Sequence, residues 1–236
     1  MRQPILLLHG LFGGLSNWKD VVTHFNGTYD VRIPPLPIYD QYRGDPLDYL
    51  VGFLENYIEQ LNCEKVVLIG NSLGGHVAIL YTHRHPEKVA QLILTGSSGL
   101  YENTGIGSYP KRGNYAYIRE RVAYTFYDPA VATDTLVDEV YRITTNALKC
   151  LNIIRTAKSA QRNYVTALLP AITTPVLLLW GEDDKISPPD VAHDFLRLLP
   201  NAELVMIPHC GHAPMMERPD IFNRETERFL ATAIPA

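Results

Sequence analysis

The sequence is short of cysteine and of long apolar runs, and each shortage excludes a class of protein. Its three cysteines, Cys63, Cys150 and Cys210, are widely spaced, so neither a disulfide framework nor a C-x-x-C zinc site is predicted. Free thiols are typical of a reducing compartment, and we expect a cytoplasmic protein. No apolar stretch approaches the length of a membrane span, and the apolar start at 5–8 is too short for a signal peptide.

A strong excess of charge of one sign is also missing. Lysine and arginine total 21 and aspartate and glutamate total 25, which gives 236 residues a net charge of −4. This balance gives no reason to expect a nucleic acid or a membrane as partner. The sequence contains no internal repeats or low-complexity linkers, and its length fits one α/β domain with an insertion.

One stretch is highly informative. A short apolar run at 66–69 ends at a glycine, and a helical pattern begins shortly afterwards. Between them lies Gly70-Asn71-Ser72-Leu73-Gly74, a G-x-S-x-G pattern on a strand-to-helix turn. Glycines two positions either side of Ser72 are needed because bulkier residues would collide with the neighbouring strand and helix. The Leu73 N–H lies at the helix start and can face the group that Ser72 attacks. We therefore predict Ser72 as a nucleophile.

Strands and helices alternate through the rest of the chain. Strands are predicted at 5–8, 29–33, 66–69, 89–95, 175–180 and 204–207, and helices at 47–61, from the glycine pair to 85, at 191–199 and at 219–231. Asp45-Pro46 is typical of a helix start. The alternation indicates the α/β class, with a mostly parallel sheet and helices on both faces.

Residues 99–169 differ from their surroundings because no strand pattern occurs there. They contain nine lysines and arginines against six acidic residues, so this segment is +3 while the rest of the chain is −7. Two helical patterns follow one another, at 136–144 and 148–154, and Asp134 is placed to cap the first. We expect a helical lid over 99–169, inserted into a core formed by 1–98 and 170–236.

Two later loops supply what a serine nucleophile needs. A serine hydroxyl requires a base to take its proton, and the base requires a third group to orient it. An acidic loop follows the strand at 175–180, and a histidine loop follows the strand at 204–207, so the order is Ser, Asp, His. After the first strand comes His9-Gly10-Leu11, whose backbone N–H groups can converge on an oxyanion.

In these motifs the sequence resembles the α/β-hydrolase family over nearly its whole length. The resemblance implies Asp184 as the acid, from the Gly-x-x-Asp-x-x-Ile/Val-Pro loop, and His212 as the base, from the Gly-His pair. It implies an oxyanion hole made by the N–H groups of Leu11 and Leu73. We expect no cofactor, and no histidine pair has the spacing of a zinc site.

Neighbouring residues compete for these roles. Glu182 and Asp183 share the acid loop, and Asp183 is the alternative acid. The remaining candidates have structural interpretations: His209 as a loop residue or a support behind the site, His9 as a brace of the oxyanion loop, His76 as a residue of the helix surface, and Cys210 as a small buried filler.

The resemblance also narrows the reaction. A serine nucleophile argues against epoxide hydrolases and haloalkane dehalogenases, which use aspartate. The sequence is similar to small esterases, enol-lactone hydrolases and the C–C hydrolases of meta-ring-fission products, although the last group typically carries Trp where this chain has Ala213. We predict a carboxylic-ester hydrolase that acts on a small acyl substrate, with a C–C hydrolase as the alternative. Perhydrolysis, acyl transfer and ligand binding with little turnover stay open.

Two further expectations concern the pocket and the sheet edge. Substrate-binding residues are predicted at Phe12, Asn71, Arg119, Arg155 and Arg162, the arginines because a basic lid can receive a substrate carboxylate. The antiparallel hairpin that usually opens the sheet of this family is expected to be missing. An exposed sheet edge can then pair with another chain, which leaves a homo-oligomer open.

Overall fold

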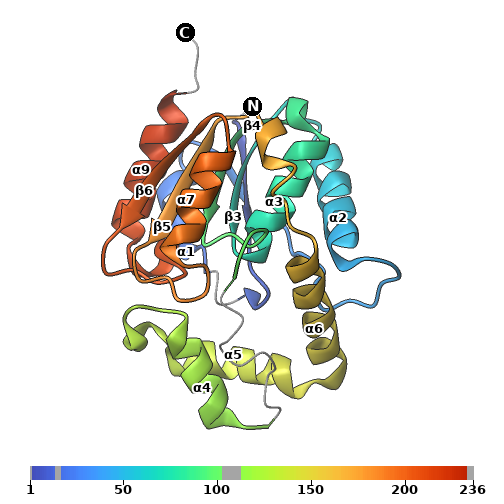
Figure 1. Cartoon of the computed structure of the whole chain (residues 1–236), viewed down its shortest axis with the longest axis vertical. Helices are drawn as coiled ribbons and strands as arrows, with labels where there is room; N and C mark the ends of the chain where they lie inside the picture. The colour runs from blue at the N-terminus through green and yellow to red at the C-terminus, as the bar shows by residue number, and fades with distance from the viewer. Residues whose placement is uncertain (1, 14–16, 103–112, 233–236) are drawn as a thin grey trace.

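The computed structural model describes residues 2–13, 17–102 and 113–232. Their sheet has six strands, all paired in parallel, in the order β2-β1-β3-β4-β5-β6 (Figure 1). The strands are β1 (Pro4–Leu8), β2 (Asp30–Arg32), β3 (Val66–Asn71), β4 (Val89–Thr95), β5 (Val176–Gly181) and β6 (Ala202–Ile207). The predicted parallel α/β sheet flanked by helices is therefore confirmed.

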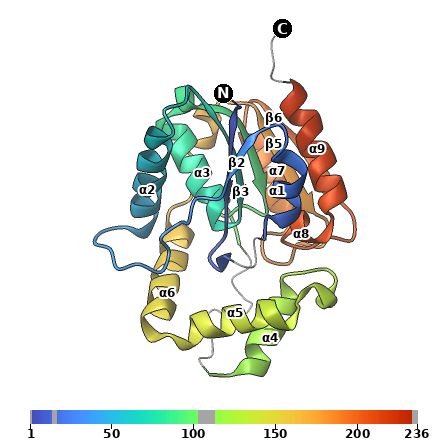
Figure 2. The same ribbon diagram turned by 180° about the vertical axis from the view of Figure 1, so that it is seen from behind.

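Helices cover both faces of the sheet. The helices are α1 (Lys19–Phe25), α2 (Pro46–Gln60), α3 (Leu73–Arg84), α4 (Tyr115–Tyr124), α5 (Asp134–Thr145), α6 (Ala147–Arg162), α7 (Pro189–Leu198), α8 (Pro214–Glu217) and α9 (Pro219–Thr232). Short 3₁₀ turns lie at η2 (Pro86–Lys88), η3 (Pro129–Val131) and η4 (Leu169–Ala171). Figures 1 and 2 show α2, α3 and α7 on one face and α1 and α9 on the other.

The strands are apolar throughout because both of their faces are buried. In β1, Leu6 and Leu8 pack into the core beneath α2, α3 and α7, whereas Ile5 and Leu7 pack into the core beneath α1 and α9. All four side chains are fully buried. Continuous apolar runs are what a parallel sheet covered on both sides requires. This explains why the central strands could be located from the sequence.

The edge strand β2 pairs with β1 alone, and no antiparallel hairpin joins the part of the sheet that the structure describes. This strand is shorter than the predicted 29–33 and is only partly buried. At an edge, one side of the strand lacks a hydrogen-bonding neighbour, so a short strand reduces the exposed length.

Helices α2 and α5 each begin directly after a residue whose side chain caps the helix. The Asp45 carboxylate accepts a hydrogen bond from the Leu47 N–H at 2.9 Å, so the predicted start of α2 is confirmed. The predicted Asp134 cap of α5 is wrong, because Thr133 has the extended backbone of a cap and its hydroxyl accepts from the Leu136 N–H at 3.4 Å. Asp134 instead occupies the first helical turn, where its charge favours the helix N-terminus.

Between β4 and β5 the described residues contain α4, α5 and α6 and no strand. Figures 1 and 2 show these three helices below the carboxyl end of the sheet. Helix α4 was not predicted, because only Ile118 and Val122 of its ten residues are buried and they form no extended apolar stripe. Loops that follow the strands of the sheet therefore face this helical segment.

Candidate active site

Ser72 lies on the turn between β3 and α3, in a backbone conformation that side chains seldom adopt. Its φ is 54° and its ψ is −122°, and a positive φ outside glycine costs about 1–3 kcal/mol. Hydrogen bonds on both sides hold the turn. The Ser72 N–H donates to the Thr95 carbonyl at 3.2 Å, and the Ser72 carbonyl accepts from the Ser98 N–H at 3.1 Å. The Ser72 side chain, on a half-buried residue, is thereby presented at the carboxyl end of the sheet.

The glycines around Ser72 are required by close backbone packing. A Cβ on Gly74 would overlap the Leu8 carbonyl of β1, and one on Gly70 would lie 2.6 Å from the Gly75 backbone. Both are contacts that no side chain can relieve by moving. The physical reason for the glycines in the G-x-S-x-G pattern is therefore present in the structure.

Asp184 and His212 form a buried pair. His212 Nδ1 and Asp184 Oδ2 are 2.8 Å apart, and the two residues are 5% and 3% exposed. The second carboxylate oxygen, Oδ1, accepts hydrogen bonds from the Ile186 N–H at 2.8 Å and the Ser187 N–H at 2.9 Å. Because a carboxylate can only accept, Nδ1 carries the proton and Nε2 is left as the basic nitrogen.

Asn71 connects the turn that carries Ser72 (the elbow, residues 70–74) to the histidine loop after β6. Its side-chain amide donates to the Thr95 carbonyl and to the His212 carbonyl, each at 3.0 Å. The residue is only 2% exposed. The Asn71 amide therefore holds the backbone of His212 beside the turn that carries Ser72, and the predicted contact of Asn71 with substrate stays a prediction.

The His212 ring lies against the end of β4, next to the elbow. A Cβ on Gly96 would be 2.7 Å from His212 Nδ1, and Gly96 directly follows Thr95, which binds both Ser72 and Asn71. Of the residues that the structure describes, Ser72 Oγ and the His212 ring share no hydrogen bond. Contacts of this kind are often long in free enzymes and tighten when substrate binds.

Glu217, which the sequence analysis missed, holds the histidine loop from behind. Its carboxylate accepts from the Gly211 N–H at 2.8 Å and from the Tyr127 N–H at 2.7 Å. The His212 N–H donates to the Thr125 carbonyl at 2.9 Å. Burial raises the pKa of Glu217, and these backbone hydrogen bonds oppose that shift. The histidine loop is thus fixed both to the turn that carries Ser72 and to the segment that follows α4.

The two predicted oxyanion donors lie at the same edge of the sheet. Leu73 is the first residue of α3, so its N–H has no partner within the helix. Leu11 follows β1, whose Leu8 pairs with Gly70 of β3. The Tyr39 hydroxyl donates to the Leu11 carbonyl at 3.1 Å and thereby fixes this loop. Both residues therefore follow neighbouring strands at this edge of the sheet, and the role of their N–H groups as an oxyanion hole stays a prediction.

Charges around His212 favour its protonated form. Burial alone lowers the pKa of His212, but the charge of Asp184, the hydrogen bond to it and the charges of Glu102 and Glu217 outweigh burial. The pKa of His212 is therefore raised above its ordinary value. A base with a raised pKa binds the serine proton more strongly, at the expense of activity in acid.

We expect kcat/KM to fall in acid, because His212 must be neutral to accept a proton. Since its pKa is raised, the midpoint of the acid limb should lie above about pH 6.5, the value of an unperturbed histidine. The measurement is kcat/KM for a neutral ester between about pH 5 and pH 9, with circular dichroism as the control for unfolding. A midpoint clearly below the unperturbed value would contradict the assignment of His212.

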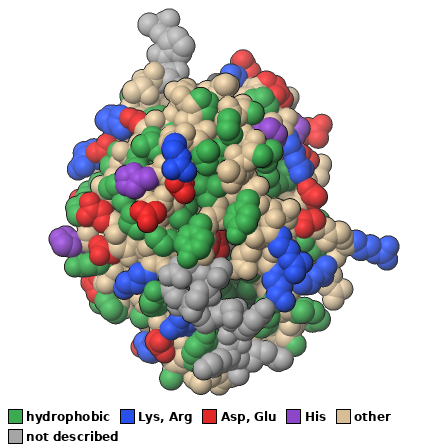
Figure 3. Space-filling model, viewed as in Figure 1, with side chains coloured by type: hydrophobic (Ala, Val, Ile, Leu, Met, Phe, Trp, Pro, Cys, Tyr) green, Lys and Arg blue, Asp and Glu red, His purple; other side chains and the backbone are tan. Residues whose placement is uncertain are grey.

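The other predicted binding residues are spread over the molecule. Phe12 is half-buried and packs against the cores on both faces of the sheet. The three arginines are exposed, and Figure 3 shows basic side chains on the surface near α6. Arg119 pairs with Asp134, and Arg155 lies over the Tyr42 ring at 5.1 Å. The role of Phe12 and of the three arginines in substrate binding stays a prediction.

His76 corrects another expectation. It is fully buried rather than on the helix surface, and burial lowers its pKa to about 4, so the ring is neutral. Helix α3 is covered on all sides near its start, which a helical wheel of α3 alone does not reveal.

His209 lies in an exposed loop with Nδ1 3.1 Å from the Tyr127 hydroxyl, and Cys210 is buried as expected. Burial raises the pKa of the Cys210 thiol, which makes it a poor nucleophile.

No group of three or more His, Cys, Asp or Glu side chains in the described ranges is arranged to hold a metal ion. Within 2–13, 17–102 and 113–232, no helix is both long and apolar enough to cross a membrane.

Comparisons with known proteins match nearly the entire chain. Residues 5–225 match the sequence model of the alpha/beta hydrolase family. A curated relative, the 2-hydroxy-6-oxo-6-(2'-aminophenyl)hexa-2,4-dienoic acid hydrolase of Metapseudomonas resinovorans, is 27% identical over 245 residues, covering 97% of this chain and 84% of the relative.

Solved structures agree with this match. An alpha/beta hydrolase enzyme from the metagenome of sediments of the Mar Chica lagoon in Morocco is 36% identical, with a TM-score of 0.79 over 98% of this chain and 92% of that chain. A serine hydrolase involved in carbazole degradation is 26% identical, with a TM-score of 0.83 over 98% of this chain and 91% of that chain. The similarity covers the sheet, both layers of helices and the helical segment between β4 and β5.

Proposed function

Because this chain belongs to the alpha/beta hydrolase family, we propose that it is a serine hydrolase whose Ser72, His212 and Asp184 cleave a carboxylic ester through an acyl-enzyme. The observation that carries the proposal is the buried pair of His212 Nδ1 and Asp184 Oδ2, 2.8 Å apart, on a loop that Asn71 ties to the elbow. A buried carboxylate that orients an imidazole beside an elbow serine is the arrangement that serine catalysis requires.

The mechanism follows from the proton positions. Ser72 Oγ attacks the ester carbonyl carbon while His212 Nε2 takes the hydroxyl proton, and Asp184 stabilises the resulting imidazolium. The N–H groups of Leu73 and Leu11 bind the oxyanion. The imidazolium then gives its proton to the departing alkoxide, which leaves as an alcohol. Water, deprotonated by His212, attacks the acyl-enzyme and releases the acid and free Ser72.

The segment 99–169 is proposed to cover this chemistry as a lid. Its described helices lie below the carboxyl end of the sheet, and the Thr125 carbonyl accepts from the His212 N–H. A cover at this position excludes water and shapes the acyl pocket. We propose 1–98 and 170–236 as the core that supports it.

C–C bond hydrolysis is the second candidate, and the names of the relatives favour it. The Metapseudomonas resinovorans relative is a hydrolase of a dienoic acid, and another, from Burkholderia cepacia, is a 2-hydroxy-6-oxo-6-phenylhexa-2,4-dienoate hydrolase with 25% identity. Against it stands Ala213, in place of the Trp that such enzymes typically carry.

A direct comparison of substrates tests the choice. We expect kcat/KM for a short p-nitrophenyl ester to exceed that for a 2-hydroxy-6-oxo-dienoate by more than about tenfold. The same two assays on Ser72→Ala establish whether both activities come from this site. Preference for the dienoate would replace ester hydrolysis by C–C hydrolysis. Absence of turnover on both, with no labelling by a fluorophosphonate, would indicate a ligand-binding protein.

A further inference from the structure

Tyr39 contacts the loop that carries Leu11, one of the two proposed oxyanion donors. It lies in the segment between β2 and α2 and is half-buried. The Tyr39 hydroxyl donates a hydrogen bond to the Leu11 carbonyl at 3.1 Å, and the Gly13 N–H donates to the same hydroxyl at 3.4 Å. One side chain from a distant part of the chain therefore holds this loop at two points.

The loop at 9–13 lies against the start of α3, where the other proposed donor, Leu73, is found. A Cβ on Gly74 would be 2.8 Å from the His9 carbonyl oxygen, so the backbones of the loop and of α3 are in contact. Among the residues that the structure describes, the Leu11 N–H has no hydrogen-bond partner. A backbone N–H in this position is therefore available to a substrate oxygen.

The direction of the Leu11 N–H depends on the two peptide units that meet at the Leu11 Cα. His9 holds the first unit, since its Nδ1 lies 2.8 Å from the Gly10 carbonyl, and a carbonyl can only accept. Tyr39 holds the second unit through the Leu11 carbonyl. Because Gly10 and Gly13 give this loop wide backbone freedom, the Leu11 N–H would point in many directions without such contacts. A donor stabilises an oxyanion best when it needs no reorganisation.

Tyr39 stays a hydrogen-bond donor throughout the neutral pH range. Burial raises the pKa of Tyr39 above its ordinary value of about 10, the hydrogen bond from Gly13 opposes this shift, and the charge of Glu139 adds to it. The hydroxyl is therefore protonated whenever His212 is neutral, and its contact with Leu11 does not change over that range.

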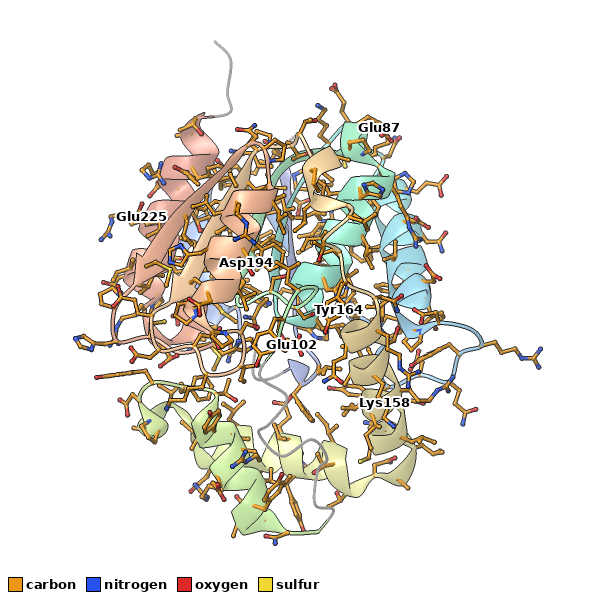
Figure 4. The ribbon with its side chains drawn as sticks, in the orientation of Figure 1. Glu87, Glu102, Lys158, Tyr164, Asp194 and Glu225 are labelled. Atoms are coloured by element: carbon orange, nitrogen blue, oxygen red, sulfur yellow. The ribbon has the colours of Figure 1, made fainter. Side chains whose placement is uncertain are left out.

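The backbone of Tyr39 is held in turn by α6, a helix of the proposed lid. Asn152 is buried, and its side-chain amide donates to the Tyr39 carbonyl at 3.0 Å and to the Asp40 carbonyl at 2.8 Å. Figure 4 shows the segment between β2 and α2 beside α6, the helix that carries the labelled Lys158. Hydrogen bonds therefore connect Asn152 to the oxyanion loop through a single residue, Tyr39.

We propose that Tyr39 is a positioning residue that fixes the Leu11 N–H for the oxyanion, and that Asn152 of α6 holds Tyr39 in place. The inference rests on the proposed serine hydrolase function and deepens it, because it names the residues that make the oxyanion hole rigid. Since Tyr39 acts through Leu11, removing its hydroxyl should weaken binding of an oxyanion and spare binding of a neutral ligand.

The first measurement is kcat/KM for a short p-nitrophenyl ester in the native protein and in Tyr39→Phe. The substitution keeps the ring and removes the hydroxyl, so the loop loses its hydrogen bonds through Leu11 and Gly13. We expect kcat/KM to fall about 10- to 100-fold, because a displaced donor loses part of the stabilisation that a well-placed donor supplies.

A pair of inhibitors separates positioning of the donor from general damage to the pocket. Ser72 Oγ adds to a trifluoromethyl ketone while His212 Nε2 takes the proton, and the carbonyl oxygen becomes an oxyanion. The trifluoromethyl carbinol of the same carbon skeleton occupies the pocket but forms no oxyanion. In Tyr39→Phe, Ki of the ketone should rise about as much as kcat/KM falls, and Ki of the carbinol should stay within about threefold of the native value.

Tyr42→Phe is the matched control. Tyr42 lies in the same segment, and its hydroxyl is 3.0 Å from Thr156 Oγ1 of α6, so this substitution removes the same atom and a contact with the same helix. Within the described ranges, the Tyr42 hydroxyl forms no hydrogen bond with 9–13. We expect kcat/KM and both Ki values within about twofold of the native values.

Asn152→Ala tests the contribution of α6. It removes the hydrogen bonds to the Tyr39 and Asp40 carbonyls and leaves the Tyr39 hydroxyl in the protein. We expect the same pattern as in Tyr39→Phe at smaller amplitude, with kcat/KM lowered about fivefold and Ki of the ketone raised to match. An unchanged kcat/KM in this variant would overturn the link to α6.

Three results would overturn the role of Tyr39 while leaving the proposed function intact. They are kcat/KM within about threefold of native in Tyr39→Phe, equal weakening of ketone and carbinol, and an equal loss in Tyr42→Phe. If circular dichroism shows that Tyr39→Phe is unfolded, Asn152→Ala decides with the same two inhibitors. A native protein that neither cleaves the ester nor reacts with a fluorophosphonate would instead refute the proposed function itself.

Discussion

Ser72→Ala is expected to lower kcat for a short p-nitrophenyl ester by about 10⁴- to 10⁶-fold. The change removes the attacking oxygen and keeps the Cβ, so the turn with its positive φ and its backbone hydrogen bonds to Thr95 and Ser98 should persist. What activity survives would come from the oxyanion donors and from substrate binding. The measurement is steady-state kcat for this ester. The variant is purified separately, so that traces of native protein do not contribute to its rate.

Labelling identifies the same atom independently. A fluorophosphonate should add covalently to the native protein and fail to add to Ser72→Ala. Ser159→Ala is a matched control, because the Ser159 hydroxyl donates to Asp45 at 2.7 Å and takes no part in the site. That control should be labelled and should keep its activity. Full activity in Ser72→Ala would remove the basis of the proposed mechanism.

Asp184→Asn is expected to lower kcat by about 10⁴-fold, because it favours the wrong tautomer of His212. The Ile186 and Ser187 N–H groups both donate to Asp184 Oδ1. In the variant the amide oxygen must stay in that position, which turns the amide nitrogen towards His212 Nδ1. Since an NH₂ group only donates, Nδ1 must become the acceptor, and the proton moves to Nε2, where it blocks the base.

Asp183→Asn is the matched control and also tests the alternative acid. Asp183 is half-buried in the same loop, and its N–H donates to the Cys210 carbonyl at 2.9 Å, a backbone contact that the substitution keeps. We expect kcat within about threefold of the native value. A larger loss in Asp183→Asn than in Asp184→Asn would transfer the role of the acid to Asp183.

Features that depend on neighbouring residues in the chain could be predicted well. The strands β3 and β4 and the start of α2 were located closely, because apolar runs covered on both faces and capping by Asp45 leave local patterns. The turn at 70–74 was recognisable because the G-x-S-x-G pattern is compact, although one of its glycines, Gly74, is required by a contact with the distant Leu8.

Features that depend on distant contacts were missed or wrongly interpreted. The hydrogen bond from the Asn71 amide to the His212 carbonyl was missed, because the two residues lie 141 positions apart. Glu217 also binds the Tyr127 N–H, 90 positions away, and nothing in the sequence around Glu217 indicates that pairing. His76 looked like a surface residue because a helical pattern does not show what packs over the helix.

The sequence by itself thus determined the parallel sheet, the turn that carries Ser72 and the order of the three candidate catalytic residues, because each is encoded by local periodicity or by a compact motif. Only the tertiary structure decided that Asp184 rather than Asp183 meets the imidazole, and that the Asn71 amide binds the His212 carbonyl. Both contacts join residues that are far apart in the chain but share a buried space of low dielectric constant. They form only when the strand ends and the helical segment pack together.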